Sequence, residues 1–426
     1  MGLNVGEVVD VTVEKPASGG RMIARHDGEV ILVSGAIPGE RVTARVSRAE
    51  KRLAFAETVH VVAPSYDRRD AAGDLTCGGC LYGHIAYPRQ VQLKAEIIED
   101  AFVRIGRIPL TDRVDVRAAA EHAYRMRARF HVRDMRAGFY REGTHELCDP
   151  RQTGQLLEAS VDAVEAALQV LAAQKVTALS VDLSENLAAD QRALHVDVAP
   201  SEDLESALAK AVQTAELTGA TARAADGAKA AAGDPIVTDL LSELTEGRAG
   251  IGVLRRHPES FFQGNRFLVG ALTGAVLDAV PPGRILDLYA GVGLFAIALA
   301  AVERGEITAV EGDAVSGRDL ERNAAPFADC IRVARSSVEA FVVRRTAGPP
   351  QTLIVDPPRT GMSKEAAEGI ARSRAPRIVY VSCDPPTMAR DARRLLDAGY
   401  GLTKLQGFDL FPNTPHVESL GVFDLA

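Results

Sequence analysis

The sequence lacks any apolar stretch long enough to cross a membrane. Its first residues, MGLNVGEVVD, also lack the basic segment and apolar run of a secretory signal. Only five of its 426 residues are cysteines, an odd number that favours reduced thiols, metal ligation or catalysis over a disulfide framework. The net charge of -8 excludes a uniformly basic surface for nucleic acid but allows local basic patches. We therefore expect a cytoplasmic protein without membrane contact.

The length and composition indicate a multidomain globular protein. A chain of 426 residues exceeds what one hydrophobic core usually organises, so we expect two or three domains. A content of 46% hydrophobic and 25% charged residues is ordinary for such proteins. The strand and helix patterns described below predict the α/β class, with an N-terminal β-barrel, a central α+β domain and a C-terminal doubly wound sheet.

Residues 1–62 show five short strand patterns separated by turn-forming pairs such as Asp27-Gly28 and Pro38-Gly39. Five strands at this spacing predict a small OB-like barrel, a fold that often binds nucleic acid. The stretch resembles a TRAM domain, a small RNA-binding barrel, most specifically in GAIPGERV at residues 35–42. Five basic residues are candidate phosphate contacts, with a solvated strand edge as the alternative for each: Arg41, Arg45, Arg48, Lys51 and Arg52.

Two cysteines, Cys77 and Cys80, stand in Cys-x-x-Cys spacing around two glycines. This spacing lets two thiolates reach one metal centre, while the glycines let the backbone wrap around it. Cys148 is a third candidate ligand, and His84 would be a fourth if the metal were zinc. Reduced structural cysteines are the alternative, because two or three ligands do not make a complete metal site.

Residues 124–133, YRMRARFHVR, alternate between mostly arginine and apolar positions, as in a strand with one buried face. Arg125, Arg127 and Arg129 share one face, so we predict a cationic surface for RNA. The alternative is an ion-paired structural face, which the scarcity of acidic residues between Tyr124 and Tyr140 disfavours.

Residues 155–250 are less informative, with Ala-rich helix patterns and two strand patterns. We predict that the Gly/Ala-rich stretch at residues 218–234, TGATARAADGAKAAAGD, is a mobile linker. After it, the aromatic pair Phe261 and Phe262 precedes polar Gln263 and a long apolar helix, which we interpret as the entrance to the last domain.

The last part of the chain contains five apolar strand patterns, each followed by a helix pattern, and then a final pair of strands. This order predicts a doubly wound parallel sheet. The strand at residues 378–381 ends just before Cys383, and Pro385 and Pro386 then precede a helix. Since ligands of open α/β sheets bind outside the carboxyl ends of the strands, Cys383 is placed to face a bound molecule. Burial as a small packing residue is the alternative.

A glycine-rich turn in LDLYAGVGLF indicates a nucleotide-like cofactor. Gly291 and Gly293 allow a tight turn before a helix N-terminus, and Glu311 ends the next strand, where it can accept hydrogen bonds from a ribose. The same glycines fit a dinucleotide fingerprint, so a nicotinamide or flavin oxidoreductase is an alternative. Asp287 favours S-adenosylmethionine, because a carboxylate would repel a pyrophosphate but attract an ammonium or sulfonium group.

A cysteine beside such a cofactor suggests methylation of pyrimidine carbon 5. A thiolate that adds at carbon 6 makes carbon 5 nucleophilic, and a base must then remove the carbon 5 proton. Cys383 would be the nucleophile, and Glu418 in FPNTPHVESL is the candidate base, with His416 as its rival. A solvated strand residue is the alternative role for Glu418.

The turn DPPR at residues 356–359 bears on a different methylation. In methyltransferases of exocyclic amines, an aromatic residue that stacks on the target base follows the Asp-Pro-Pro turn. Here Arg359 occupies that position, which favours a pairing or phosphate role and disfavours amine methylation.

Five motifs in order resemble the RNA (uracil-5-)-methyltransferase family: FFQGN, LDLYAGVGLF, IVDPPRTG, VSCDPPTMARD and FPNTPHVE. With the TRAM-like start, the resemblance covers most of the chain. It implies that Cys383 is the nucleophile and Glu418 the base. It also implies cofactor contacts from Gln263, Glu311 and Asp356, and a glycine-rich cofactor loop with Asp287, Tyr289, Gly291 and Gly293.

The resemblance also implies a domain arrangement in which an early helix packs with the catalytic domain. We expect a TRAM-like barrel at residues 1–62, a central RNA-binding domain at 63–86 and 118–262, and a methyltransferase domain at 87–117 and 263–426.

Some members of the family hold a [4Fe-4S] cluster, and Cys77, Cys80 and Cys148 match three of its ligands. The fourth cysteine is expected six positions before Cys77, where this chain has Ala71. A cluster held by three cysteines, with an aspartate such as Asp70 or Asp74 as a further ligand, and a lost cluster are both open.

We therefore predict S-adenosylmethionine-dependent methylation of uridine carbon 5 in structured RNA by a monomeric enzyme. The TRAM-like domain and the cluster-like cysteines resemble the ribosomal RNA branch of the family more than the transfer RNA branch, which is the first alternative. Phe261 or Phe262 is a candidate to hold the target uridine outside its stack. A dinucleotide oxidoreductase and a non-catalytic RNA-binding assembly factor are the alternatives from other classes.

Overall fold

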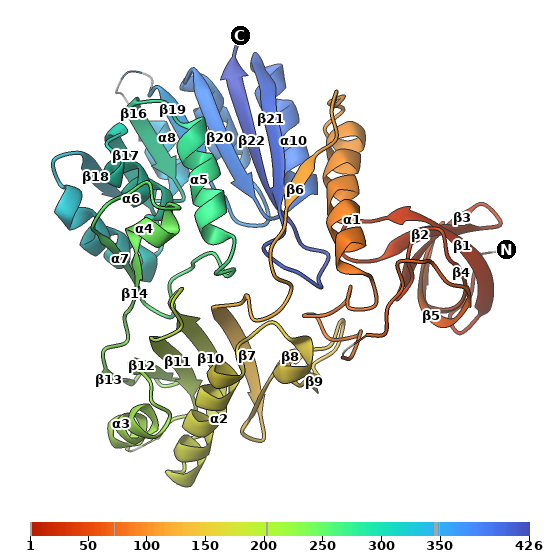
Figure 1. Cartoon of the computed structure of the whole chain (residues 1–426), viewed down its shortest axis with the longest axis horizontal. Coiled ribbons are helices and arrows are strands. Elements are labelled where there is room, and N and C mark those ends of the chain that lie inside the picture. Colours follow the sequence, from red (N-terminus) through yellow and green to blue (C-terminus); the bar gives the residue numbers. More distant parts are fainter. Residues whose placement is uncertain (1, 72, 202, 345–347, 349) are drawn as a thin grey trace.

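The computed structural model describes residues 2–71, 73–201, 203–344, 348 and 350–426. Figure 1 shows a β-barrel at the N-terminus, a central α+β domain and a large sheet covered by helices. This arrangement confirms the predicted α/β class. Within the described residues, no helix is both long enough and apolar enough to span a membrane.

The N-terminal barrel closes on itself. Its strands among the described residues are β1 (Val8–Pro16), β2 (Met22–His26), β3 (Glu29–Ser34), β4 (Arg41–Glu50) and β5 (Leu53–Ala63). Neighbours follow the order β1-β2-β3-β5-β4, and β4 pairs with β1 to close the barrel. Alternate residues of β1, such as Val9, Val11 and Val13, are buried and fill the interior. The barrel predicted from the turn spacing is confirmed.

The central domain is a mixed sheet with helices on one face. Its strands are β7 (Arg127–Arg133), β8 (Arg136–Tyr140), β9 (Leu147–Cys148), β10 (Ala178–Glu185), β11 (Arg192–Val198), β12 (Gly219–Ala224) and β13 (Lys229–Gly233). Neighbours follow the order β13-β12-β11-β10-β7-β8-β9. The helices are α2 (Glu158–Ala173) and α3 (Leu204–Thr214), and a short 3-10 helix covers Pro150–Thr153. Phe130, Leu168 and Leu194 belong to the apolar core between these helices and the sheet.

The prediction of a mobile linker at residues 218–234 is wrong, because this stretch forms β12 and β13. β12 pairs with β11 in parallel, and β13 pairs with β12 as an antiparallel edge strand. Ala220, Ala222 and Ala224 are buried in the central core, whereas Arg223 between them is exposed. The short alanine side chains follow the strand period of two, although their composition is typical of a linker.

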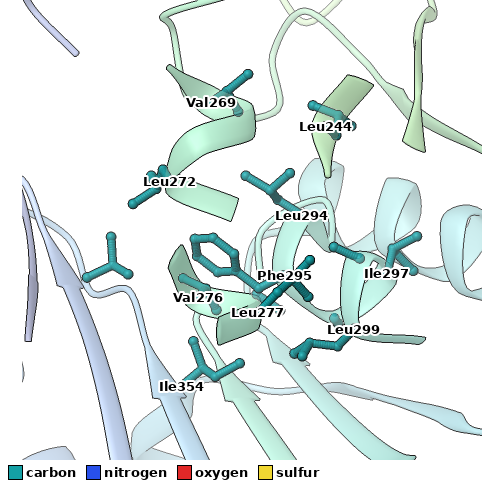
Figure 2. Close-up of a cluster of buried hydrophobic side chains, with 14 of the residues drawn as sticks. Leu244, Val269, Leu272, Val276, Leu277, Leu294, Phe295, Ile297, Leu299 and Ile354 are labelled. Carbon is teal, nitrogen blue, oxygen red and sulfur yellow. The ribbon is translucent and has the colours of Figure 1, made fainter. Parts of the chain in front are cut away.

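A short strand pair leads from the central domain to the large sheet. It consists of β14 (Val237–Leu240) and β15 (Val253–Arg256), with helix α4 (Leu241–Leu244) after β14. Figure 2 shows Leu244 of α4 in the same buried cluster as Leu294 and Phe295 of helix α6 (Leu294–Ala301). Residues that pack against the large sheet therefore begin before residue 263, the predicted start of the second segment of the methyltransferase domain.

The large sheet has a parallel centre. Its strands are β6 (Asp115–Arg117), β16 (Gly283–Leu288), β17 (Gly305–Glu311), β18 (Ile331–Arg335), β19 (Thr352–Val355), β20 (Arg377–Ser382), β21 (Tyr400–Phe408) and β22 (Glu418–Leu425). Neighbours follow the order β18-β17-β16-β19-β20-β22-β21-β6. β16 to β20 are mutually parallel, as the sequence predicts.

Helices cover both faces of this sheet. They are α1 (Tyr87–Asp100), α5 (Val269–Ala279), α6 (Leu294–Ala301), α7 (Ala314–Ala324), α8 (Val338–Arg344), α9 (Lys364–Arg372) and α10 (Pro385–Asp397). A π-helix at Ala101–Ile105 and a 3-10 helix at Ala325–Phe327 follow α1 and α7. Side chains of α5, α6 and α7 form one apolar core, and those of α1, α8, α9 and α10 form the other. The sheet is therefore buried between two helical layers.

Two elements from early in the chain, strand β6 and helix α1, pack with the large sheet. β6 pairs in parallel with β21 at the edge of the sheet, and Ile98 of α1 lies in the apolar core with Met388 of α10. Figure 1 shows α1 standing between the barrel and the large sheet. Residues 87–117 therefore pack with a sheet whose other strands begin at Gly283.

The β12–β13 hairpin generates the first prediction. Replacement Ala222→Glu places a carboxylate in the central core and should lower the free energy of unfolding by about 3 kcal/mol. Ala231→Glu is the matched control, because Ala231 lies on the exposed side of β13 and should change the stability little. Urea denaturation measures both variants. Equal, small effects would show that the stretch behaves as a linker.

Candidate active site

The carboxyl ends of parallel strands bring predicted site residues to one edge of the large sheet. Tyr289 follows β16, Glu311 ends β17, Asp356 follows β19 and Cys383 follows β20. These strands are parallel neighbours, so the residues after them start from the same edge.

Glu418 reaches this edge because its strand runs in the opposite direction. β22 lies antiparallel between β20 and β21, and its residue Ser419 pairs with Ser382 of β20. The first residue of β22, Glu418, therefore lies beside the end of β20, where Cys383 follows. The predicted nucleophile and base stand at the ends of neighbouring strands.

A cavity of about 750 Å³ opens at this edge, between the large sheet and the central domain. The predicted site residues on its wall are Arg125, Arg127, Gln263, Tyr289, Gly291, Glu311, Asp356, Cys383 and Glu418. Asp287, Gly293 and Arg129 are not among its lining residues. The cavity thus unites five of the seven candidate cofactor residues with both candidate catalytic residues.

The glycine-rich loop forms one side of the cavity. Tyr289 and Gly291 adopt left-handed backbone conformations with φ of 62° and 57°. The Gly291 N–H donates to Glu311 Oε2 at 2.7 Å, and the Asp313 N–H donates to Glu311 Oε1 at 2.6 Å. Glu311 therefore ties the loop after β16 to the end of β17, and its carboxylate can accept further hydrogen bonds from a ligand.

Asp287 does not line the cavity. The prediction from the sequence that its carboxylate attracts the cationic groups of S-adenosylmethionine is therefore not supported. Its side chain is fully buried, and its Oδ2 accepts from the Ala296 N–H of α6 at 3.1 Å. Burial, and then the nearby Asp356, raise the pKa of Asp287 to about 8. Asp287 thus fixes the start of α6 as a mostly protonated acid and is not placed to attract a cation.

Gly293 has a packing role behind the loop. It caps α6 with φ of 97°, and a Cβ there would lie 2.7 Å from Leu320 Cδ1. Its missing side chain therefore lets the loop approach α7.

The Cys383 thiol is mostly protonated in this site. Burial, and then the Glu418 carboxylate, raise the pKa of Cys383 to about 12. Arg359, which also lines the cavity and hydrogen-bonds with the thiol, lowers this pKa. Arg359 is therefore the side chain that favours the thiolate, the reactive form of a cysteine.

Two carboxylates, buried Glu418 and partly exposed Asp356, line the cavity together with Cys383. Burial, and then Asp356, raise the pKa of Glu418 well above its usual value, while Arg359 opposes this shift. Burial raises the pKa of Asp356 to about 7, against a hydrogen bond from Gln263. The raised pKa makes the ionised carboxylate of Glu418 a stronger base, and Arg359 favours the ionised form that can accept a proton.

The rival base, His416, lies outside the cavity wall. Burial, and then Arg359, lower the pKa of His416 to about 4. Its ring packs edge-on against Phe411, with the ring centroids 5.9 Å apart. Position and basicity both favour Glu418 over His416.

The strand with Arg125, Arg127 and Arg129 has the predicted alternation, but all three arginines already have partners within the protein. Arg125 Nη1 donates to Gln155 Oε1 at 2.6 Å, and Arg127 Nε donates to Ser260 O at 3.1 Å. Arg129 Nη2 pairs with Asp197 at 3.3 Å. The scarcity of nearby acidic residues in the sequence is therefore misleading, because Asp197 comes from β11.

The aromatic pair splits between the cavity and the core. Phe261 is 58% exposed, and the Arg127 guanidinium lies 5.8 Å from its ring centroid. Phe262 is only 3% exposed and packs with Arg256, 4.1 Å from its ring. Both residues touch the cavity, but only Phe261 offers an open ring for a base.

Several cavity residues escape prediction from the sequence. Arg223 and Glu259, joined at 2.9 Å, line the cavity from the central domain, and Leu410 and Phe411 line it from the loop before β22. The motif FPNTP contains Phe411, so its place could have been noticed. Arg223 lies in the stretch that the sequence predicts to be a linker, so it is not among the predicted site residues.

The three candidate metal ligands lie together but do not form a metal site. Cys77 and Cys148 are joined in a disulfide, contrary to the expectation of reduced thiols. Burial, and then Asp74, raise the pKa of the free Cys80 thiol to about 11. The Asp74 carboxylate already accepts from Thr76 and Arg141. Across the described parts of the chain, no group of three or more histidine, cysteine or acidic residues could hold a metal ion.

These contacts do not fit a [4Fe-4S] cluster. The expected first ligand is Ala71, and His84 has its Nε2 3.2 Å from Ala36 O, buried against the barrel. Of the three cysteines, Cys80 is a free thiol and the other two form a disulfide, so the cluster that the sequence left open is not supported.

The reactivity of Cys383 gives a prediction. Because the thiolate is the reactive form and the pKa lies far above neutrality, alkylation of Cys383 by iodoacetamide should speed up about tenfold per pH unit from pH 7 to 9. Arg359→Gln should slow the reaction several-fold at each pH, because it removes the charge that lowers the pKa. Peptide mass spectrometry gives the rates. Lys364→Gln, an exposed cation on α9, should leave them unchanged, and an equal or faster rate in Arg359→Gln would contradict the assignment.

Two family models match the chain. A TRAM domain model matches residues 2–59, which span the barrel strands up to β5. A model described as tRNA (Uracil-5-)-methyltransferase matches residues 250–425. The second match contains Gln263, Cys383 and Glu418.

Relatives match over nearly the whole chain. The 23S rRNA (uracil(1939)-C(5))-methyltransferase RlmD of Halomonas elongata is 32% identical, over 96% of this chain and 88% of its own length. RlmD of Pseudomonas entomophila is 31% identical, over 99% and 94%. An uncharacterized RNA methyltransferase of Streptomyces coelicolor is 30% identical, over 99% and 94%.

The fold also resembles a solved structure, the Pyrococcus abyssi tRNA (uracil-54, C5)-methyltransferase in complex with S-adenosyl-L-homocysteine. It has a TM-score of 0.75 at 22% identity and covers 97% of this chain and 100% of its own. The relatives at 30% identity or more cover nearly the whole chain, so their match includes the barrel, the glycine loop and the cysteine at the sheet edge. The chain belongs to the RNA (uracil-5-)-methyltransferase family.

Proposed function

We propose that this enzyme methylates carbon 5 of a uridine in ribosomal RNA, with S-adenosylmethionine as methyl donor and Cys383 as nucleophile. The observation that carries the proposal is that Cys383 and Glu418, on neighbouring strands, line one cavity together with Glu311 and Asp356. Family membership disfavours the oxidoreductase and the non-catalytic assembly factor as alternatives.

Cys383 begins the reaction. The thiol first loses its proton to solvent, and the sulfur of the resulting thiolate adds to carbon 6 of the uracil. The electrons of the carbon 5–carbon 6 double bond then move toward carbon 5 and its adjacent carbonyl. Arg359 supports this step, because its charge favours the thiolate over the thiol. S-adenosylmethionine, when bound, supplies the methyl group that carbon 5 takes up.

Glu418 completes the reaction. Its carboxylate takes the proton from carbon 5, the double bond forms again, and the sulfur of Cys383 leaves carbon 6 as the thiolate. The proximity of Asp356 raises the proton affinity of Glu418 and so assists this transfer. Glu418 itself is buried, which limits the competition of water for its carboxylate.

The cavity fits S-adenosylmethionine through its carboxylates and its loop. Glu311 is positioned to accept hydrogen bonds from the ribose hydroxyls, and the exposed backbone at Gly291 lets the ligand approach closely. Gln263 and Asp356, joined by a hydrogen bond, offer polar contacts near the thiol. The proposal includes no iron–sulfur cluster.

Support for an RNA substrate comes from the barrel and from the open aromatic ring. The relatives RlmD carry 23S rRNA in their names, which favours ribosomal RNA. The name of the family model and that of the solved neighbour mention transfer RNA, which is the second candidate. Phe261 is the proposed stacking surface for a base, and Arg127 beside it is the proposed phosphate contact. We also propose a monomeric enzyme in the cytoplasm.

A methylation assay tests the substrate. The protein is incubated with radiolabelled S-adenosylmethionine and either ribosomal or transfer RNA from cells lacking the enzyme. We expect 5-methyluridine in a single position of ribosomal RNA, identified by nuclease digestion and mass spectrometry. Label only in transfer RNA would contradict the ribosomal preference, and label on an exocyclic nitrogen would contradict carbon 5 chemistry.

A further inference from the structure

The loop between β21 and β22 determines where Glu418 and one cavity wall lie. It runs from Asp409 to Val417 and ends at Glu418, the first residue of β22. Leu410 and Phe411 in this loop line the cavity. Any change in its conformation would therefore move both the base and the wall beside the substrate.

Lys94 of α1 holds the start of this loop. Its Nζ donates to Asp409 Oδ1 at 2.5 Å and to the Phe411 carbonyl oxygen at 3.0 Å. Both side chains of the Lys94–Asp409 ion pair are completely buried. The same carbonyl of Phe411 accepts from Thr414 Oγ1 at 2.7 Å, so two donors fix its direction.

Gln90, one helical turn before Lys94, holds the middle of the loop. Its Nε2 donates to Asn413 Oδ1 at 2.9 Å, and its Oε1 accepts from the Asn413 N–H at 2.9 Å. Asn413 has a left-handed backbone with φ of 62°, a conformation that needs support from its surroundings. The Tyr124 hydroxyl adds a bond to Pro412 O at 3.2 Å.

The chemistry of these contacts indicates a role beyond stability. A buried ion pair is seldom more stabilising than well-packed apolar residues of similar size. Here Lys94 donates to two loop atoms, and the Gln90 amide joins Asn413 to the backbone carbonyls of Tyr82 and Ile85 before α1. Together these bonds fix a backbone turn that leads directly to Glu418. Their geometric effect is therefore the orientation of this loop.

We propose that Lys94 and Gln90 are positioning residues for proton removal by Glu418. The inference rests on the proposed function and names what the early helix α1 contributes to it. Neither residue lines the cavity, so each acts on the reaction through the loop.

The last chemical step gives a measurable effect that a loss of protein stability alone would not produce. A misplaced Glu418 slows removal of the carbon 5 proton, while attack by Cys383 and transfer of the methyl group still occur. The methylated RNA then stays attached to Cys383. On a denaturing gel with unmodified RNA, the covalent complex should accumulate, as it should in Glu418→Gln.

The test variant replaces the ion pair by apolar groups, Lys94→Met with Asp409→Leu, so that no charge is left buried alone. We expect turnover to fall about 10- to 100-fold, with the covalent complex accumulating and cofactor binding unchanged. Lys15→Met is the control, because it removes the exposed Lys15–Asp100 pair at the other end of α1 and should behave as the wild type.

Turnover within twofold of the wild type, or turnover and covalent complex falling together, would overturn the inference. Should the double variant not fold, Gln90→Met gives the same readout, because it removes the two amide bonds to Asn413 from outside the cavity. A several-fold loss of turnover with accumulation of the covalent complex supports the inference, and no accumulation overturns it. The wild type with 5-fluorouridine RNA runs beside each variant. Failure of the wild type to form a complex there would count against the proposed function itself.

Discussion

The antiparallel pairing of β22 with β20 is the constraint on which the site depends. In a sheet of parallel strands, only residues that follow strands reach the carboxyl edge. The reversed β22 adds a residue that begins a strand, Glu418, and the Ser382–Ser419 pair sets it beside the residue after β20. A shift of one residue in this register would turn Glu418 to the other face of the sheet. Cys383 would then lose its base.

Burial gives the site its chemical character. Burial raises the pKa of Cys383, Asp356 and Glu418. The thiol is therefore mostly protonated, and each carboxylate is a stronger base when it is ionised. Arg359 is the counterweight, because it lowers the pKa of Cys383 and opposes the shift of Glu418. A single guanidinium thus connects the two groups that act at the start and the end of the proposed reaction.

The sequence predicts the parallel sheet and its edge residues because apolar strand patterns end where ligands bind. Cys383 and Glu311 follow from strand ends alone. Glu418 follows from the FPNTP loop that returns the chain to the sheet and from the resemblance, but no local pattern shows that β22 runs antiparallel to β20. The hairpin at 218–234 could not be recognised from composition, because alanines fill its buried face. Asp287 shows a further limit: its sequence position suggests contact with a cation, but burial and the Ala296 amide decide its role.

Long-range partners account for the remaining differences. The acid that neutralises Arg129 comes from a strand some 70 positions later, and Cys77 is bonded to Cys148 across 71 positions. Lys94 has a still more distant partner, because its ion pair with Asp409 spans 315 positions, from α1 to the loop before Glu418. Such pairs depend on the assembled fold and leave no local signal in the sequence.

Covalent capture of RNA by Cys383 is the most direct measurement. The protein is mixed with S-adenosylmethionine and RNA that contains 5-fluorouridine, and the products are separated on a denaturing gel beside Cys383→Ala. Fluorine cannot leave carbon 5 as a proton does, so the adduct at carbon 6 cannot resolve. We expect a slow band with the intact protein and none with the variant. No band from folded protein that binds RNA and cofactor would contradict the role of Cys383 as nucleophile.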